Sequence, residues 1–365
     1  MSAEFSDAPA PRALSSVFYV YDVVREGDEL VYYGEPLVDQ RTLHQTAWPL
    51  FDERGYEVSI ESRPGETVLV AEPARESGEA FPWTNVALAA LTVLTTLYAG
   101  TQWYHVDPLS LDVVRALPFV AAVMGVLGVH EFGHYLMSRY HDVDASLPYF
   151  IPIPFTPIGT LGAVIKMKGV MPDRKTLFDI GVAGPLAGLV ATIVVSAIGL
   201  LLPPISVPAA PAGTVSVAFG NPPLLRGIAW LLGQPLEYGD GLAVSPVVFG
   251  GWVGMFVTFL NLLPVGQLDG GHVMRAVFGP SYERVAPLVP GALFGLAGYV
   301  YFALDAPNGA TVWLMWGVIT SVFVFVGTAH PVSEEPLDRK RLVVAGVTLL
   351  LGLLCFMPVP IRIIG

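Results

Sequence analysis

Residues 117–137 read LPFVAAVMGVLGVHEFGHYLM. As a helix rising 1.5 Å per residue, this run is long enough to cross the ~30 Å hydrocarbon core of a bilayer. Two histidines and a glutamate near its end carry a large insertion cost, and ionisable groups inside a membrane segment are functional candidates by default. The run therefore predicts a membrane helix that carries chemistry.

His130, Glu131 and His134 form the pattern His-Glu-x-x-His. Positions i and i+4 of a helix lie on one face, so the two imidazoles can bind one zinc ion. Glu131 then lies beside the metal as the base for its water. The competing interpretation is a helix-packing or proton-path cluster without a metal.

A catalytic zinc ion needs three protein ligands and one open position for water, so a further ligand must come from elsewhere in the chain. The candidates are Asp269, His272 and Asp179. Geometry favours Asp269, because it follows an apolar segment that ends on the same side of the membrane as residues 117–137. In the competing interpretations, Asp269 is a turn residue before a glycine and His272 makes a structural hydrogen bond. Asp179 either orients a ligand histidine or interacts with the N-terminus of its helix.

Seven apolar segments are long enough to be membrane spans, at residues 84–101, 117–137, 178–202, 247–263, 286–304, 311–328 and 342–358. With these spans, sixteen of the 19 Lys and Arg residues fall on one side of the membrane. Positively charged residues stay preferentially in the cytosol. We therefore expect an integral protein of the cell membrane with a cytoplasmic N-terminus.

The composition agrees with a membrane protein, since 53% of the 365 residues are hydrophobic and only 14% are charged. The net charge of −12 belongs mainly to the N-terminal part, and an acidic surface excludes nucleic acid as a partner. Apolar runs there predict two β-hairpins around a helix at residues 39–53. The expected domains are an acidic α/β module, a linker, a membrane core and a C-terminal loop with the last span, at residues 1–71, 72–83, 84–330 and 331–365.

The segment from Pro148 to Lys168 interrupts this helical pattern with four prolines, which remove amide donors and resist helix formation. Non-helical backbone at membrane depth needs shielding by protein or a water-filled cavity. We expect a re-entrant, β-like loop near the metal, whose edge from Gly159 onward can pair with an unwound substrate. A packing loop at the lipid headgroups is the alternative.

With these motifs, the sequence resembles the site-2 protease family of membrane metalloproteases, particularly its archaeal and plastid-type branch. The resemblance covers roughly residues 84–330. It rests on His130 to His134, the Pro-rich Pro148 to Pro152 with Gly159 to Ala163, Gly184 to Gly188, and Asn261 with Leu268 to Gly270. Apart from the resemblance, the glycines of Gly184 to Gly188 predict close approach of the third span to another helix.

The resemblance implies one zinc ion per chain held by His130, His134 and Asp269, with Glu131 as catalytic base and Asn261 near the substrate carbonyl. It implies hydrolysis of a peptide bond in single-span membrane proteins, within the lipid bilayer and close to its cytoplasmic face. Two alternatives stay open: a proton-linked transporter or channel, and a catalytically silent family member that binds substrates without cutting them. The sequence leaves the oligomeric state open.

Overall fold

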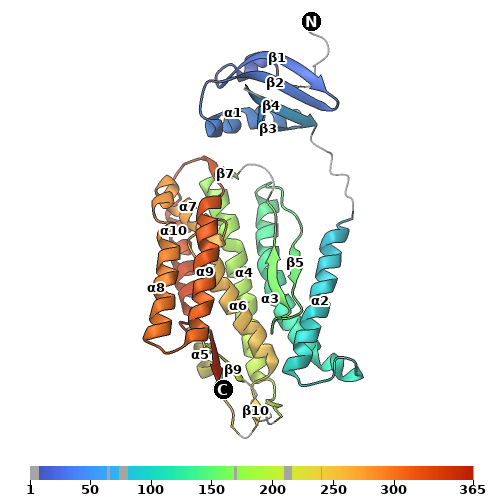
Figure 1. Ribbon diagram of the computed structural model, residues 1–365, viewed down its shortest axis with the longest axis vertical. Helices are drawn as coiled ribbons and strands as arrows, with labels where there is room; N and C mark the ends of the chain where they lie inside the picture. Colours follow the sequence, from blue (N-terminus) through green and yellow to red (C-terminus); the bar gives the residue numbers. More distant parts are fainter. Residues whose placement is uncertain are drawn as a thin grey trace. The chain divides into compact units, whose positions relative to one another are not determined.

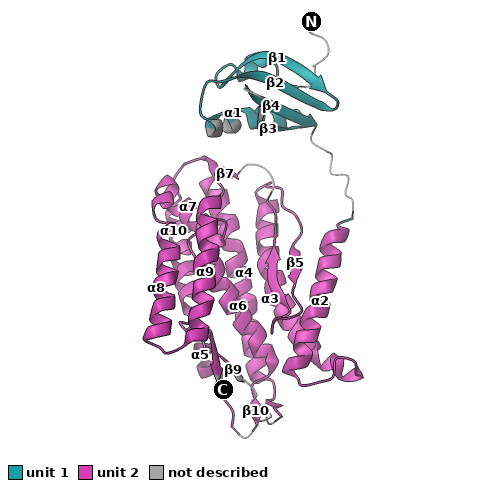
Figure 2. Ribbon diagram, in the orientation of Figure 1, with its two compact units in different colours: residues 1–81 teal, residues 82–365 magenta. Residues whose placement is uncertain are grey.

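A computed structural model describes residues 8–63, 66–73, 81–167, 171–208, 216–239 and 241–364. The chain divides into two compact units, residues 1–81 and 82–365, shown in different colours in Figure 2. The first unit is a small α/β fold, and the second is built mainly of helices. Each unit has hydrophobic clusters of its own.

The N-terminal unit is a four-stranded antiparallel sheet with one helix against it. Its elements are the 3-10 helix η1 (Pro11–Leu14), β1 (Phe18–Glu26), β2 (Glu29–Pro36), α1 (Gln40–Asp52), β3 (Tyr56–Arg63) and β4 (Glu66–Pro73). The strand order is β1-β2-β4-β3. The two predicted hairpins and the helix between them are confirmed, and pairing of β2 with β4 joins the hairpins into one sheet. Most of the predicted linker lies outside the described residues.

The second unit is that of a helical membrane protein. Among the described residues, four helices are long and apolar enough to cross a membrane: α2 (Trp83–Trp103), α3 (Leu117–Tyr140), α4 (Arg174–Leu201) and α9 (Pro307–Val326). The helix α3 continues from the 3-10 helix η2 (Leu111–Ala116). A fifth candidate is the bent pair formed by α7 (Asp269–Phe278) with η3 (Gly279–Arg284) and α8 (Leu288–Phe302), whose axes meet at 88°.

The expectation of seven spans is therefore supported only in part. All seven predicted segments are helical, but α6 (Pro246–Asn261), α8 and α10 (Arg339–Leu354) have only 15 or 16 residues. Sixteen helical residues cover about 24 Å, which is less than the hydrocarbon thickness. The apolar runs are longer than these helices because their ends adopt turns, such as the turn after Asn261.

The helix α4 lies at the centre of this unit and contacts α3, α6, α7 and α10, as can be followed in Figure 1. Small residues allow these helices to approach closely. A Cβ atom on Gly251 or Gly254 of α6 would overlap Ser196 or Thr192 of α4. In a membrane, where burial of apolar groups drives association weakly, such close packing holds helices together.

The Pro-rich segment forms a hairpin of β5 (Tyr149–Pro152) and β6 (Thr160–Val164), which lies between α2 and α3 in Figure 1. Side chains of α2 hydrogen-bond to its carbonyl groups. Asn85 Nδ2 donates to the carbonyls of Leu147 and Pro148 at 2.8 and 3.1 Å, and Trp103 Nε1 donates to Pro157 at 2.7 Å. Since Asn85 and Trp103 stand at the two ends of α2, the hairpin follows this helix along most of its length. The predicted departure from helix is confirmed.

Short elements complete the ends of the helices. They are β7 (Met171–Asp173) parallel to β11 (Pro331–Ser333), β8 (Ile205–Ser206) with β10 (Leu242–Ala243), β9 (Ser216–Phe219) with β12 (Ile361–Ile364), and the helix α5 (Pro223–Leu232). In Figure 1, α7 and β7 lie at one end of the helices, and α5, β9 and the C-terminus lie at the other. The two ends of the second unit are therefore built from different short elements.

Candidate metal centre

The helix α3 supplies two imidazoles that are one turn apart and face α4. His130 and His134 are 3% and 6% exposed. Their Nε2 atoms lie 3.3 Å from each other, so both rings present a potential ligand atom to the same point. This arrangement follows directly from the spacing of four residues in a helix.

Asp269 meets the two histidines from the first residue of α7. Its Oδ2 atom lies 3.2 Å from His130 Nε2, and its Oδ1 atom lies 3.2 Å from His134 Nε2. The chain between α6 and α7 turns sharply back on itself. A Cβ atom on Gly270 would overlap the carbonyl of Leu262, so only glycine allows this close approach at the start of α7.

These three residues suit a zinc ion. Their donor atoms all lie within 4.8 Å of one another. In a tetrahedral site with metal–ligand bonds of about 2.0 Å, neighbouring ligand atoms are about 3.3 Å apart. The observed separations of 3.2 to 3.3 Å match this spacing. Two imidazoles and one carboxylate are also a donor set that catalytic zinc sites use, with one position left for water.

A backbone contact fixes the orientation of His134. Its Nδ1 atom lies 2.8 Å from the carbonyl oxygen of Ile180 in α4. A carbonyl only accepts hydrogen bonds, so Nδ1 carries the proton and donates it, and the Nε2 lone pair is free for a metal. Such partners of ligand histidines commonly fix the ring and raise its basicity.

Two glycines of α4 make the space that the imidazoles occupy. A Cβ atom on Gly184 would overlap His134 Nε2, and a Cβ atom on Gly188 would lie 2.9 Å from His130 Nδ1. The same close approach appears at Gly133, where a Cβ atom would lie 2.7 Å from the carbonyl oxygen of Ala183. The predicted close approach of the third span is confirmed, but its role at the histidines was missed. The sequence contained a signal for this role, because the glycine pair Gly184 and Gly188 has the same spacing of four residues as the histidine pair His130 and His134.

Glu131 and Asn261 also lie at this centre. Glu131 is 6% exposed and close enough to His134 and Asp269 to interact with them electrostatically. Asn261 is the last residue of α6, and its Nδ2 atom lies 3.2 Å from His130 Nε2. The amide therefore stands beside His130, on the end of a different helix from the histidines.

The other two ligand candidates have different positions. Asp179 does not contact a ligand histidine: its carboxylate accepts hydrogen bonds from Arg341 Nε and Nη2 at 2.8 and 2.6 Å and lies 3.1 Å from His141 Nε2. It thus links α4 to α10, which the sequence could not reveal because Arg341 is 162 residues away. His272 is buried against Gly181 of α4 and does not belong to the three-residue cluster.

Comparisons with known proteins find a peptidase family and several probable zinc metalloproteases that are similar to this chain. Residues 118–301 match the family described as Peptidase family M50. The chain is 34% identical to the probable zinc metalloprotease EGY1, chloroplastic, of Arabidopsis thaliana, over 76% of this chain and 51% of that relative. It is also 34% identical to the protein of the same name from Oryza sativa subsp. japonica, over 68% of this chain and 48% of the relative. The chain is 32% identical to the probable zinc metalloprotease EGY2, chloroplastic, of Arabidopsis thaliana, over 78% of this chain and 50% of that relative. The chain spans about half the length of these relatives.

Proposed function

Because this chain belongs to peptidase family M50, we propose that it is an intramembrane zinc peptidase that hydrolyses a peptide bond of single-span membrane proteins near the cytoplasmic face of the bilayer. The observation that carries the proposal is the meeting of His130, His134 and Asp269 within hydrogen-bond distance, on helices α3 and α7 of a membrane unit. A structural role alone would not explain three such groups with the spacing of a zinc site.

In this proposal His130, His134 and Asp269 hold the metal. Bound zinc would supply a water molecule with a pKa lowered towards about 7 and a Lewis acid for the scissile carbonyl. Glu131 accepts the proton from the attacking water and later passes it to the leaving amine. The Asn261 amide donates a hydrogen bond to the oxygen of the carbonyl under attack, a contact that can contribute about 3 kcal/mol to the transition state.

The test uses purified protein and a single-span substrate in detergent or vesicles. Glu131→Gln should abolish cleavage while keeping about one zinc per chain, because a glutamine amide is too weak a base but the ligands are intact. Asp269→Ala should lose the zinc itself. Asn261→Ala should keep zinc and lower kcat about a hundredfold. Undiminished cleavage by Glu131→Gln would refute the assigned base, and solute flux without cleavage would favour a transporter.

The β5–β6 hairpin would present the substrate. A peptide bond inside a helix is sterically closed to attack, so the substrate must unwind, and an extended segment can pair with the edge of a strand. Two features support β6 as that edge: in its two-stranded sheet β5 covers one side, and Leu161 is 66% exposed. We assign substrate pairing to the other side of β6, from Thr160 to Val164.

Proline substitutions can test the two edges separately. Successive amides of a strand point to opposite sides, so Ala163→Pro and Val164→Pro each remove a donor from a different edge. The variant that removes the outer donor should lose cleavage and keep its zinc. Unchanged cleavage by both variants would contradict substrate pairing and favour a packing loop at the headgroups.

We also propose that α6, α8 and α10 span the membrane, which gives seven passes with the N-terminus and the metal centre on the cytoplasmic side of the cell membrane. The side with sixteen of the 19 basic residues supports this orientation. The functional division would follow residues 1–71, 84–330 and 331–365. In a Cys355→Ala background, a membrane-impermeant maleimide should label Ile363→Cys in intact cells and Glu335→Cys only after permeabilisation. Equal labelling of both in intact cells would place the ends of α10 on one side.

A further inference from the structure

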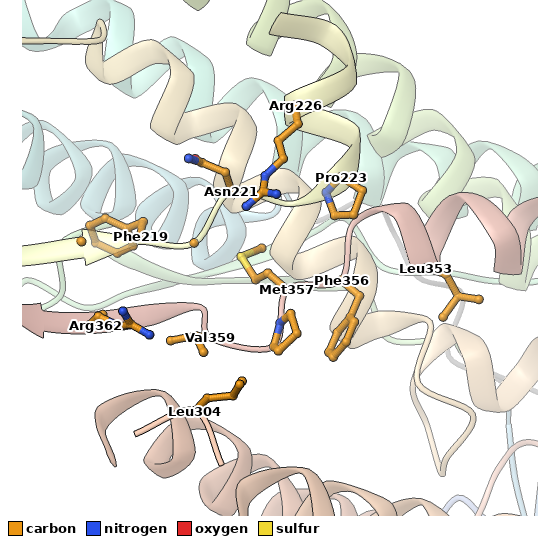
Figure 3. Close-up of a pocket in the computed structure, with 13 residues that line it drawn as sticks. Phe219, Asn221, Pro223, Arg226, Leu304, Leu353, Phe356, Met357, Val359 and Arg362 are labelled. Carbon is orange, nitrogen blue, oxygen red and sulfur yellow. The ribbon is translucent and has the colours of Figure 1, made fainter. Parts of the chain in front are cut away.

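A cavity of about 530 Å³ lies at the end of the second unit that is remote from the metal centre. Its walls are β9 and the start of α5, the end of α10 with residues 356–359, β12, and Leu304 after α8. Figure 3 shows these side chains around the opening. The volume is in the range typical of small-molecule sites, and none of the groups proposed for catalysis lines it.

The position of the cavity follows from the course of α10. This helix begins beside Asp179, one residue before the carbonyl that orients His134, because Arg341 binds Asp179. It ends at Leu354. Leu353 lines the cavity, about 18 Å along the helix from Arg341. The cavity thus lies near the membrane surface opposite the metal centre.

The cavity is lined by two arginines that have no ionic partner among the described residues. Only three basic residues of the sequence fall in the segments expected at this end: Arg115, Arg226 and Arg362. Arg115 pairs with Asp112 at 3.2 Å. Within the part of the chain that the structure describes, Arg226 and Arg362 have no ion pair, and both line the cavity. In Figure 3, Arg226 extends from α5 toward Asn221, and Arg362 lies on β12 beside Val359.

Beside these charges, the cavity and its surroundings are apolar. Phe219, Phe356, Met357 and Leu353 line it, and the adjoining face of α10 exposes Leu350, which is 60% exposed. The helix α5 is too short to span and exposes Trp230 and Leu231, which are 83% and 77% exposed. Exposed tryptophan and leucine on a short helix are typical of the membrane interface. The arginines therefore lie at the level of the lipid headgroups.

The cavity walls are held in place by hydrogen bonds from two tryptophan side chains to backbone carbonyls and by the pairing of two strands. Trp252 Nε1 donates to the carbonyl of Gly220 at 2.6 Å, and Trp313 Nε1 donates to that of Pro358 at 2.7 Å. The strands β9 and β12 pair in register from Ser216 to Phe219. The site is thus formed before a ligand arrives, which lowers the entropic cost of binding.

We propose that this cavity binds an anionic phospholipid of the leaflet opposite the metal centre. The headgroup phosphate accepts hydrogen bonds from Arg226 and Arg362, and an acyl chain lies along Leu353 and Phe356. Guanidinium groups suit a phosphate because they donate bidentate, charge-assisted hydrogen bonds. Basic pockets between membrane helices bind anionic headgroups in this way. The apolar wall favours a lipid over a soluble anion or an acidic peptide.

The test measures lipid retention by native mass spectrometry of the full chain, with phosphatidylglycerol and phosphatidylcholine. The wild type should retain phosphatidylglycerol preferentially. Arg226→Gln with Arg362→Gln should weaken its binding about thirtyfold, at about fivefold for each basic residue near anionic lipid. The matched control Arg115→Gln, which removes a base at the same end but outside the cavity, should bind like the wild type. Equal binding by the double variant, or equal retention of both lipids, would overturn the proposal.

Further measurements test whether the double variant loses lipid only because it misfolds, and whether another ligand occupies the cavity. The variant Arg226→Lys with Arg362→Lys keeps both charges and should keep the preference for phosphatidylglycerol. In the wild type, a photoactivatable phosphatidylglycerol should label residues 353–359, whereas labelling confined to other regions would contradict the site. Displacement of the lipid by equimolar inorganic phosphate or a soluble acidic peptide would overturn the lipid assignment and identify one of those as the occupant instead.

Discussion

At the scale of single residues, the metal centre depends on Gly184, whose lack of a side chain leaves room for the imidazole of His134. The imidazole of His134 fills the space that a side chain at position 184 would take, while its Nδ1 atom donates to Ile180 on the same helix α4. Gly184 and Ile180 stand one helical turn apart, so a single stretch of α4 both makes room for the ring and orients it. Glycine at position 184 is therefore a positioning residue for the metal.

The substitution Gly184→Ala should displace His134 and weaken zinc binding by about tenfold to a hundredfold, the range seen when groups that orient a ligand are removed. Zinc content after dialysis against a graded chelator measures the loss. Gly125→Ala is the matched control, because a Cβ atom on that glycine of α3 would meet nothing within 4 Å. Equal zinc retention by the two variants would show that the ring has room to move.

At the scale of elements, the ten-residue helix α7 carries Asp269 and depends on neighbours for its position. The Arg174 guanidinium of α4 donates to the carbonyls of Ala276 and Val277 at 2.8 Å, and so caps the C-terminal end of α7. Arg275 of α7 is 1% exposed and pairs with Glu334, with one contact from Nη1 to Oε2 at 3.1 Å. These contacts tie the ligand-bearing helix to α4 and to the segment before α10.

The pair also predicts a pH dependence of stability. The hydrogen bonds from Arg275 lower the pKa of Glu334 below its ordinary value of 4.5. A lowered folded-state pKa contributes stability above the unfolded pKa, and this contribution is lost as the pH falls through the folded value. Since Glu334 is 41% exposed, solvent screens the interaction, and we expect it to contribute about 1 kcal/mol.

Melting temperatures of the wild type and Glu334→Gln should therefore differ most near neutral pH and converge as the pH falls below the ordinary glutamate pKa of 4.5. Glu335→Gln is the control, because that residue is 74% exposed and pairs with the half-exposed Lys175 at 3.4 Å. A constant difference across the pH range would mean that the charge of Glu334 does not stabilise α7.

At the scale of the whole molecule, the two units have separate cores. In the N-terminal unit, Phe51 of α1 is fully buried and its ring meets that of Tyr32 edge-on, with the centroids 5.1 Å apart. In the second unit, the largest buried cluster gathers around residues such as Phe119 and Trp252 of α3 and α6. Because each unit buries its own apolar side chains, a defect in one core should leave the other folded.

Phe51→Ala should destabilise the N-terminal unit by about 3 to 5 kcal/mol, the usual cost of removing a buried phenylalanine side chain. Zinc content and the melting transition of the membrane unit should stay unchanged. Proteolysis monitored by peptide mass would report cleavage within residues 1–81 alone. Loss of zinc in this variant would reveal that the metal centre depends on the N-terminal unit.

The sequence by itself determined the membrane class, the α/β module and the pairing of His130 with His134, because hydropathy and a spacing of four residues are local properties of a chain. The sequence also favoured Asp269 as the third ligand over Asp179 and His272, but only the tertiary structure showed that its carboxylate meets the histidines, since His130 and Asp269 are 139 residues apart. The tertiary structure also showed that Gly184 makes room for His134, and that the helices α6, α8 and α10 are shorter than the apolar segments that predicted them. The physical reason is that contacts between distant segments depend on the depth and rotation of each helix, which packing against all its neighbours sets.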